Sequence, residues 1–126
     1  MANATNASKV GNLINSSHPL PDGSVATTAS SNWSLAAAGT TQATATPVTA
    51  QLNRITNNTA ANGVILPVGI QGQVIMIYPA LVTNAPKVYP PVGGTIGGGA
   101  ANASVAATAQ VKSFYYCIDD TGLNWI

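Results

Sequence analysis

Residues 48–56 read VTAQLNRIT, and residues 74–78 read VIMIY. Apolar and polar side chains alternate in the first segment, with Val48, Ala50 and Leu52 on one side and Thr49, Gln51 and Asn53 on the other. A period of two is typical of a β-strand with one buried face. The second segment is apolar on both faces, so it predicts a strand that is covered by a second sheet, by another segment of the chain or by a neighbouring subunit.

Further short strands are expected around these two segments. Residues 63–67 (GVILP) and 87–91 (KVYPP) each predict a short strand that ends at proline, the second one at the edge of a sheet. Residues 110–118 predict a strand with Val111, Tyr115 and Cys117 facing one way and Phe114 and Tyr116 the other. Evidence for helix is thin, with at most a turn near residues 33–38. Short strands joined by Gly- and Pro-rich turns predict an all-β fold, an antiparallel β-sandwich or jelly roll.

The first 47 residues have a different composition, dominated by Ala, Asn, Ser and Thr without a sustained apolar period. We therefore expect an extended, mostly irregular N-terminal arm over residues 1–47 and a domain over residues 48–126. The few large apolar residues of the arm are candidates to contact a partner: Leu13, Ile14, Trp33 and Leu35. Candidates for the core or for a subunit interface come from the later strands: Val74, Met76, Tyr78, Val88 and Tyr89.

Charge is scarce throughout the chain. Four basic and three acidic residues make up 6% of the 126 residues, against about 25% in an average soluble domain. With a net charge of +1 and no basic stripe, nucleic-acid binding is not expected. Residues 1–20 show no secretory signal, and no run approaches the 18 apolar residues of a membrane span, so we expect synthesis in a cytoplasm and no membrane partner. A surface with so little charge favours permanent assembly into a larger object.

The titratable side chains offer little for catalysis. They are His18 in the arm, Asp22, the expected acidic turn at Asp119 and Asp120, and Cys117 within a strand. No His or Lys neighbours Cys117 in sequence to lower its pKa, and the glycine-rich residues 93–99 lack the Gly-Lys-Ser/Thr ending of a phosphate loop. We therefore predict no catalytic residue, no metal site and no cofactor, and hence a protein that is not an enzyme.

Several short motifs of the second half carry a family resemblance. They are residues 63–67 (GVILP), residues 72–74 (GQV), residues 88–91 (VYPP) continuing to Ile96, and residues 114–116 (FYY) followed by Trp125. Taken together they resemble small head-decoration, cement or head-fibre proteins of tailed bacteriophages. The resemblance covers about half of the chain and leaves residues 1–47 out. It implies a structural virion protein that binds the major capsid protein on the outer capsid surface as a homotrimer and stabilises the shell.

A binding module is the alternative interpretation. A host-adsorption fibre or a carbohydrate-binding β module would use exposed aromatic rings as stacking platforms. The candidates for that role are Trp33, Tyr78, Tyr89 and Trp125.

Overall fold

The computed structural model describes residues 18–19, 25–26, 29–57, 61–81, 85–108 and 110–126. The chain divides into two units, residues 1–30 and residues 31–126. In the first unit, β2 (His18–Pro19) pairs antiparallel with β3 (Val25–Ala26). Among the described residues, no helix is long and apolar enough to cross a membrane.

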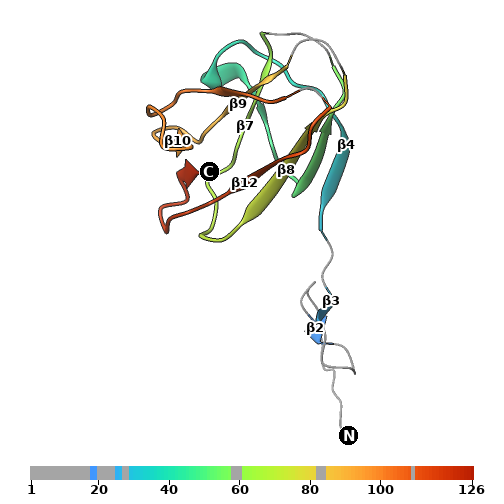
Figure 1. The fold of residues 1–126 in the computed structure, drawn as a ribbon, viewed down its shortest axis with the longest axis vertical. Coiled ribbons are helices and arrows are strands. Elements are labelled where there is room, and N and C mark those ends of the chain that lie inside the picture. The colour runs from blue at the N-terminus through green and yellow to red at the C-terminus, as the bar shows by residue number, and fades with distance from the viewer. Residues whose placement is uncertain (1–17, 20–24, 27–28, 58–60, 82–84, 109) are drawn as a thin grey trace, which may run out of the picture. The chain divides into compact units, whose positions relative to one another are not determined.

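The second unit consists almost entirely of short strands. Its strands are β4 (Ser31–Leu35), β5 (Thr46–Pro47), β6 (Leu52–Ile55), β7 (Gly63–Ile65), β8 (Val74–Pro79), β9 (Lys87–Tyr89), β10 (Thr95–Ile96), β11 (Val105–Ala106), β12 (Ser113–Tyr116) and β13 (Asn124–Trp125). Helix in the described ranges is limited to one 3-10 turn, η1 (Gln42–Thr44). The strands form two four-stranded sheets, in the orders β12-β8-β6-β4 and β11-β9-β7-β5, and a small sheet of β10 and β13 (Figure 1). The prediction of an all-β fold is confirmed.

The chain passes back and forth between the two large sheets. Strands β4, β6 and β8 belong to one sheet and β5, β7 and β9 to the other, so each connection within one sheet contains a strand of the opposite sheet. Neighbouring strands in both series pair in parallel, whereas β12 and β11 add antiparallel at one edge of each sheet. The predicted antiparallel arrangement is therefore wrong for the pairs β4–β6, β6–β8, β5–β7 and β7–β9. Parallel neighbours need a long crossover connection, and here a strand of the second sheet supplies it.

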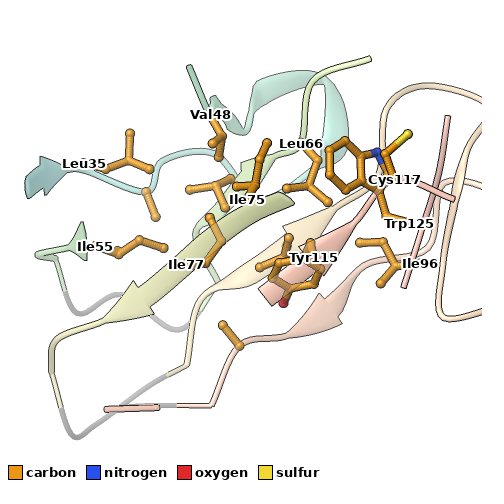
Figure 2. Packing of buried hydrophobic residues seen from close by; sticks show 14 residues of the cluster. Leu35, Val48, Ile55, Leu66, Ile75, Ile77, Ile96, Tyr115, Cys117 and Trp125 are labelled. Carbon is orange, nitrogen blue, oxygen red and sulfur yellow. The ribbon is translucent and has the colours of Figure 1, made fainter. Parts of the chain in front are cut away.

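Both large sheets contribute to one hydrophobic core. The buried cluster includes Leu35, Ile55, Ile75, Ile77 and Tyr115 from the first sheet, Val64 and Val88 from the second, and Val48, Leu66, Ile96, Cys117 and Trp125 from the remaining segments. Figure 2 shows the labelled members of this cluster gathered in one space between the strands. Burying each large aliphatic side chain contributes about 1.5–3 kcal/mol, so the cluster holds the two sheets together.

The compact unit begins earlier in the chain than the composition predicts. Residues 31–35 form β4 and pair with β6, while residues 46–47 form β5 and pair with β7. Residues 31–47 are therefore part of the sheets rather than of an arm, and the boundary lies at Ser31 instead of Val48. Residues 31–35 form β4, so the turn expected near residues 33–38 is not found there, and the 3-10 turn η1 lies further along at Gln42–Thr44.

Two strands also differ from their predicted positions. Strand β9 lies inside its sheet between β7 and β11, not at an edge. Within residues 48–56 the strand covers only Leu52–Ile55. Val48 and Ala50 are buried as predicted, but the alternation shifts after Ala50, so Asn53 and Ile55 are buried and Leu52 is only partly buried. The Asn53 side chain is fully buried, and its Nδ2 donates to the carbonyl oxygens of Ala50 at 2.8 Å and Met76 at 3.3 Å. These bonds reduce the cost of burying the amide, but its Oδ1 has no hydrogen-bond partner among the described residues, so the amide is only partly satisfied.

Candidate functional site

The sheet β12-β8-β6-β4 has one face against the core and one facing away from it. Side chains alternate along a strand, and residues paired across strands share a face. Since Ile55, Ile75, Ile77 and Tyr115 lie in the core, the residues between them lie on the opposite face. We call this the outer face; on β6, β8 and β12 it consists of Leu52, Arg54, Val74, Met76, Tyr78, Phe114 and Tyr116.

An apolar patch occupies the β12 side of the outer face. Phe114 pairs with Met76, and Tyr116 pairs with Val74. Ile126 lies directly opposite Tyr116, because each backbone N–H of this pair donates to the carbonyl oxygen of the other. Phe114, Tyr116 and Ile126 are 49%, 47% and 54% exposed, so about half of each side chain remains available to a partner. We define the apolar patch as Val74, Met76, Phe114, Tyr116 and Ile126, of which Phe114, Tyr116 and Ile126 are exposed, Val74 is half-buried and Met76 is buried. Exposed apolar side chains gathered in this way typically mark an interaction site.

Met76 is buried although it lies on the outer face. It is flanked by Phe114 on β12 and by Leu52 on β6, its partners in register on the two sides. Its exposed fraction is only 5%. The VIMIY segment is thus buried on both of its faces, with Ile75 and Ile77 in the shared core and Met76 on the outer face.

A second group of side chains crosses the β4 side of the outer face. Asn32 on β4 pairs with Asn53 on β6, and Leu35 pairs with Ile55. Two residues of β4, Trp33 and Ser34, therefore lie opposite the single residue Arg54 of β6. This is a β-bulge, which leaves two successive residues of β4 exposed.

Arg54 in turn pairs with Tyr78 on β8. The Arg54 Nη1 donates to the Trp33 carbonyl oxygen at 3.4 Å, and the Trp33 side chain is 57% exposed. We call Trp33, Ser34, Arg54 and Tyr78 the aromatic–arginine row.

The structure separates the residues that the sequence singles out as contacts. Leu13 and Ile14 lie outside the described residues. Trp33, Val74, Met76 and Tyr78 lie on the outer face, which brings them together on one sheet. Leu35 is 5% exposed and packs in the core, so it is not available to a partner as the sequence interpretation expects.

Val88 and Tyr89 belong to the interior of the unit rather than to its surface. Val88 is fully buried, and the Tyr89 hydroxyl donates to the Thr40 carbonyl oxygen at 3.0 Å. Trp125 is also fully buried. Of the four proposed stacking platforms, only Trp33 and Tyr78 therefore reach the surface, and both lie in the aromatic–arginine row.

The titratable groups of the C-terminal turn form a structural network. The Asp119 carboxylate accepts hydrogen bonds from the Asn124 side chain and from the Thr121 hydroxyl. The Asn124 Oδ1 accepts hydrogen bonds from the backbone N–H and the hydroxyl of Thr95 at 3.2 and 2.9 Å. The side-chain hydrogen bond from Asn124, followed by the one from Thr121, lowers the pKa of Asp119 below its ordinary value, in spite of an opposing desolvation effect. This network ties β10 to β13.

The remaining titratable residues are not brought together. Cys117 is 2% exposed, and its thiol lies 3.6 Å from the Asp119 carbonyl oxygen. Asp22 lies outside the described residues, and of His18 only the backbone in β2 is described. Within the described ranges, no group of three or more His, Cys, Asp or Glu side chains is placed to hold a metal ion.

Several members of the outer face are missing from the contacts predicted from the sequence. The sequence interpretation places Phe114 and Tyr116 on a strand without assigning them a contact. Ile126 joins the apolar patch through backbone pairing with Tyr116, for which no sequence signal exists. Arg54 is the single charged residue in β4, β6, β8 and β12, and a lone charge in an otherwise uncharged sheet is a signal that the sequence does contain. Comparison with known proteins finds no matching family model, curated protein or solved structure.

Proposed function

We propose that this chain is a structural virion protein that binds the outer capsid surface as a homotrimer and stabilises the shell. The observation that carries the proposal is the apolar patch, in which Phe114, Tyr116 and Ile126 are each about half exposed on a regular sheet. The resemblance of several short motifs to head-decoration proteins of tailed phages also favours the proposal. In this proposal the protein is made in the host cytoplasm and acts on the assembled capsid.

The apolar patch is the proposed subunit interface of the trimer. Removing a large apolar side chain from water contributes about 1.5–3 kcal/mol, and an assembly repeats that gain at every copy of the interface. The chain carries few charges that would oppose the approach of a second copy. Because Met76 is already buried within one chain, the energetic gain would come from Phe114, Tyr116 and Ile126.

The segment before Ser31 is the proposed contact with the major capsid protein. It would act as an extended arm, and Leu13 and Ile14 are the side chains proposed to anchor it. The two large sheets and their shared core would form a sandwich-like body that displays the arm.

Light scattering on the purified protein tests the interface. We expect a mass three times the 12.6 kDa of one chain for the natural sequence, and a monomer for the double variant Phe114→Ser/Tyr116→Ser. The control is Val68→Ser/Val92→Ser, which removes two exposed apolar side chains from loops outside the sheet β12-β8-β6-β4. This control is expected to leave the trimer intact. A monomeric natural protein, or a patch variant that remains trimeric, would contradict the proposed interface.

Mixing with undecorated capsids of the same virus tests the arm. The deletion should cover residues 2–28, because a longer one would remove β4 and damage the sheet. We expect the shortened protein to remain a trimer and to lose capsid binding. Unchanged binding after the deletion would refute the arm as the capsid contact.

A further inference from the structure

The aromatic–arginine row has a composition distinct from that of the apolar patch on the same face. Two aromatic side chains, one aliphatic hydroxyl and one guanidinium lie along adjacent strands: Trp33 and Ser34 on β4, Arg54 on β6 and Tyr78 on β8. The β-bulge produces this arrangement, since a regular strand would turn one of Trp33 and Ser34 toward the core. Bulges commonly re-aim side chains next to functional sites.

The positive charge of Arg54 favours a ligand that carries a negative charge. Arg54 is exposed and is the single charged residue in the four strands of this sheet, so the row presents a positive charge with no acid beside it on those strands. A guanidinium pairs with a carboxylate through two parallel hydrogen bonds. Aromatic faces on both sides supply flat apolar surface, and a hydroxyl both donates and accepts hydrogen bonds.

We propose that the aromatic–arginine row binds an acidic saccharide. One sugar ring stacks on Trp33, its carboxylate pairs with Arg54, and the adjoining ring lies against Tyr78. Ser34 is placed to hydrogen-bond a sugar hydroxyl. This inference does not rest on the proposed capsid function, because the row and the apolar patch are different sets of residues.

An acidic peptide fits the row less well than a sugar. Extended peptides usually bind a sheet by adding a strand to an open edge. On β4, the Ser34 N–H is already bonded to the Asn32 Oδ1 at 3.1 Å, and β5 at the edge of the other sheet contains Pro47, which has no N–H to donate. Ring stacking on an open face does not need a free edge.

Tryptophan fluorescence can report on this row selectively. Trp33 is 57% exposed and Trp125 is fully buried, so acrylamide quenches Trp33 first. The full-length protein is titrated with two acidic probes, 3′-sialyllactose and a hyaluronan tetrasaccharide, with lactose as the neutral counterpart. We expect at least one acidic probe to protect Trp33 from acrylamide. Lactose should need a concentration about ten times higher for the same protection, because it cannot form the charge-assisted hydrogen bond with Arg54.

Two variants, each lacking one positive charge, distinguish a direct contact with Arg54 from the effect of the net charge of the protein. We expect Arg54→Gln to weaken the acidic probe about tenfold. Lys87→Gln, on β9 of the opposite sheet, should bind as the natural protein does. The unquenched emission of the buried Trp125 shows that each variant is folded.

Several results would overturn the proposal. They are the absence of protection by both acidic probes, equal protection by lactose, unchanged binding by Arg54→Gln, and equal protection by a capped peptide of alternating Asp and Gly. The last result would assign the row to an acidic peptide. None of these results affects the mass measured for the patch variants. The proposal of a saccharide site and the proposal of a trimer interface can therefore be refuted independently.

Discussion

Tyr116 and Ile126 lie directly opposite each other and exchange two backbone hydrogen bonds, from Tyr116 N–H to Ile126 O at 2.8 Å and from Ile126 N–H to Tyr116 O at 3.0 Å. Next to them, Cys117 and Trp125 form an antiparallel bridge, with both side chains buried. The chain segment at residues 124–126 therefore has two roles. It inserts Trp125 into the core and adds Ile126 to the apolar patch.

The substitution Ile126→Ser should weaken self-association without loss of fold. It removes a half-exposed side chain from the patch, while the backbone pairing with Tyr116 does not depend on the side chain. Surface substitutions of this kind usually change stability by less than about 0.5 kcal/mol. Light scattering over a dilution series should show dissociation at higher protein concentration than in the natural protein. The matched control is Val92→Ser in an exposed turn; an equal effect of that control would show that general hydrophobicity, and not the patch, drives association.

Some of these features follow directly from the sequence. The orientation of residues 114–117 is confirmed, because Tyr115 and Cys117 are buried whereas Phe114 and Tyr116 are exposed. The prediction is wrong for Val111, which is 48% exposed and precedes β12 (Ser113–Tyr116), a strand shorter than the expected residues 110–118. A strict period of two with large side chains leaves only one way to bury half of them. The strand at VIMIY follows for a similar reason, since β-branched and aromatic residues favour a pleated sheet.

Other features depend on partners that are distant in sequence. Asn53 is buried because strand pairing brings the Met76 carbonyl oxygen within reach of its amide, and this cannot be known before β6 and β8 are paired. Parallel pairing depends on where each crossover runs, and short strands with Gly- and Pro-rich turns look alike in either direction. The aromatic–arginine row needs the bulge at Trp33 and Ser34, which is a register shift between two strands and not a property of either one.

Replacing Gly69 should destabilise the protein. A Cβ at this position would lie 2.6 Å from Trp125 Cζ2 and 3.1 Å from Cys117 Sγ, so Gly69→Ala would push against a fully buried indole. Overpacking of a core typically costs about 1–3 kcal/mol. Urea unfolding followed by tryptophan emission measures the loss. Gly99→Ala is the control, since its nearest contact is the Ile96 carbonyl oxygen at 3.2 Å in an exposed turn; a loss at Gly99 as large as at Gly69 would contradict this account.

Removing the Asn53 side chain should also lower stability. Asn53→Ala leaves the carbonyl oxygens of Ala50 and Met76 without the amide that donates to them in the interior. A buried polar group left unsatisfied costs about 1–3 kcal/mol, but the substitution also removes the Asn53 Oδ1, which has no partner among the described residues, so we expect a net loss of about 1 kcal/mol. Asn32→Ala is the control, because the Asn32 side chain bonds an exposed N–H that water can reach instead. Urea unfolding should show a clear loss for Asn53→Ala and little change for Asn32→Ala; equal midpoints would show that the buried amide contributes nothing.

The loss of protein stability at low pH should depend in part on Asp119. Hydrogen bonds from Asn124 and Thr121 lower the pKa of this carboxyl in the folded protein below its ordinary value of 3.8. The folded state therefore binds the proton less readily than the unfolded chain does. The stabilisation is present above the unfolded pKa, is lost as the pH falls through the folded pKa, and is absent below both values. Asp119→Asn should remove this part of the pH dependence, so the melting temperatures of the variant and the natural protein should converge as the pH is lowered below 3.8. Asp120→Asn removes the neighbouring exposed carboxylate as a control for net charge. A difference in melting temperature between Asp119→Asn and the natural protein that stayed constant through the acid range would contradict this account. The hydrogen bonds to the ionised carboxylate would then not be the source of the pH dependence. In that case the Asp119–Asn124–Thr95 network would hold β10 to β13 by its neutral hydrogen bonds alone.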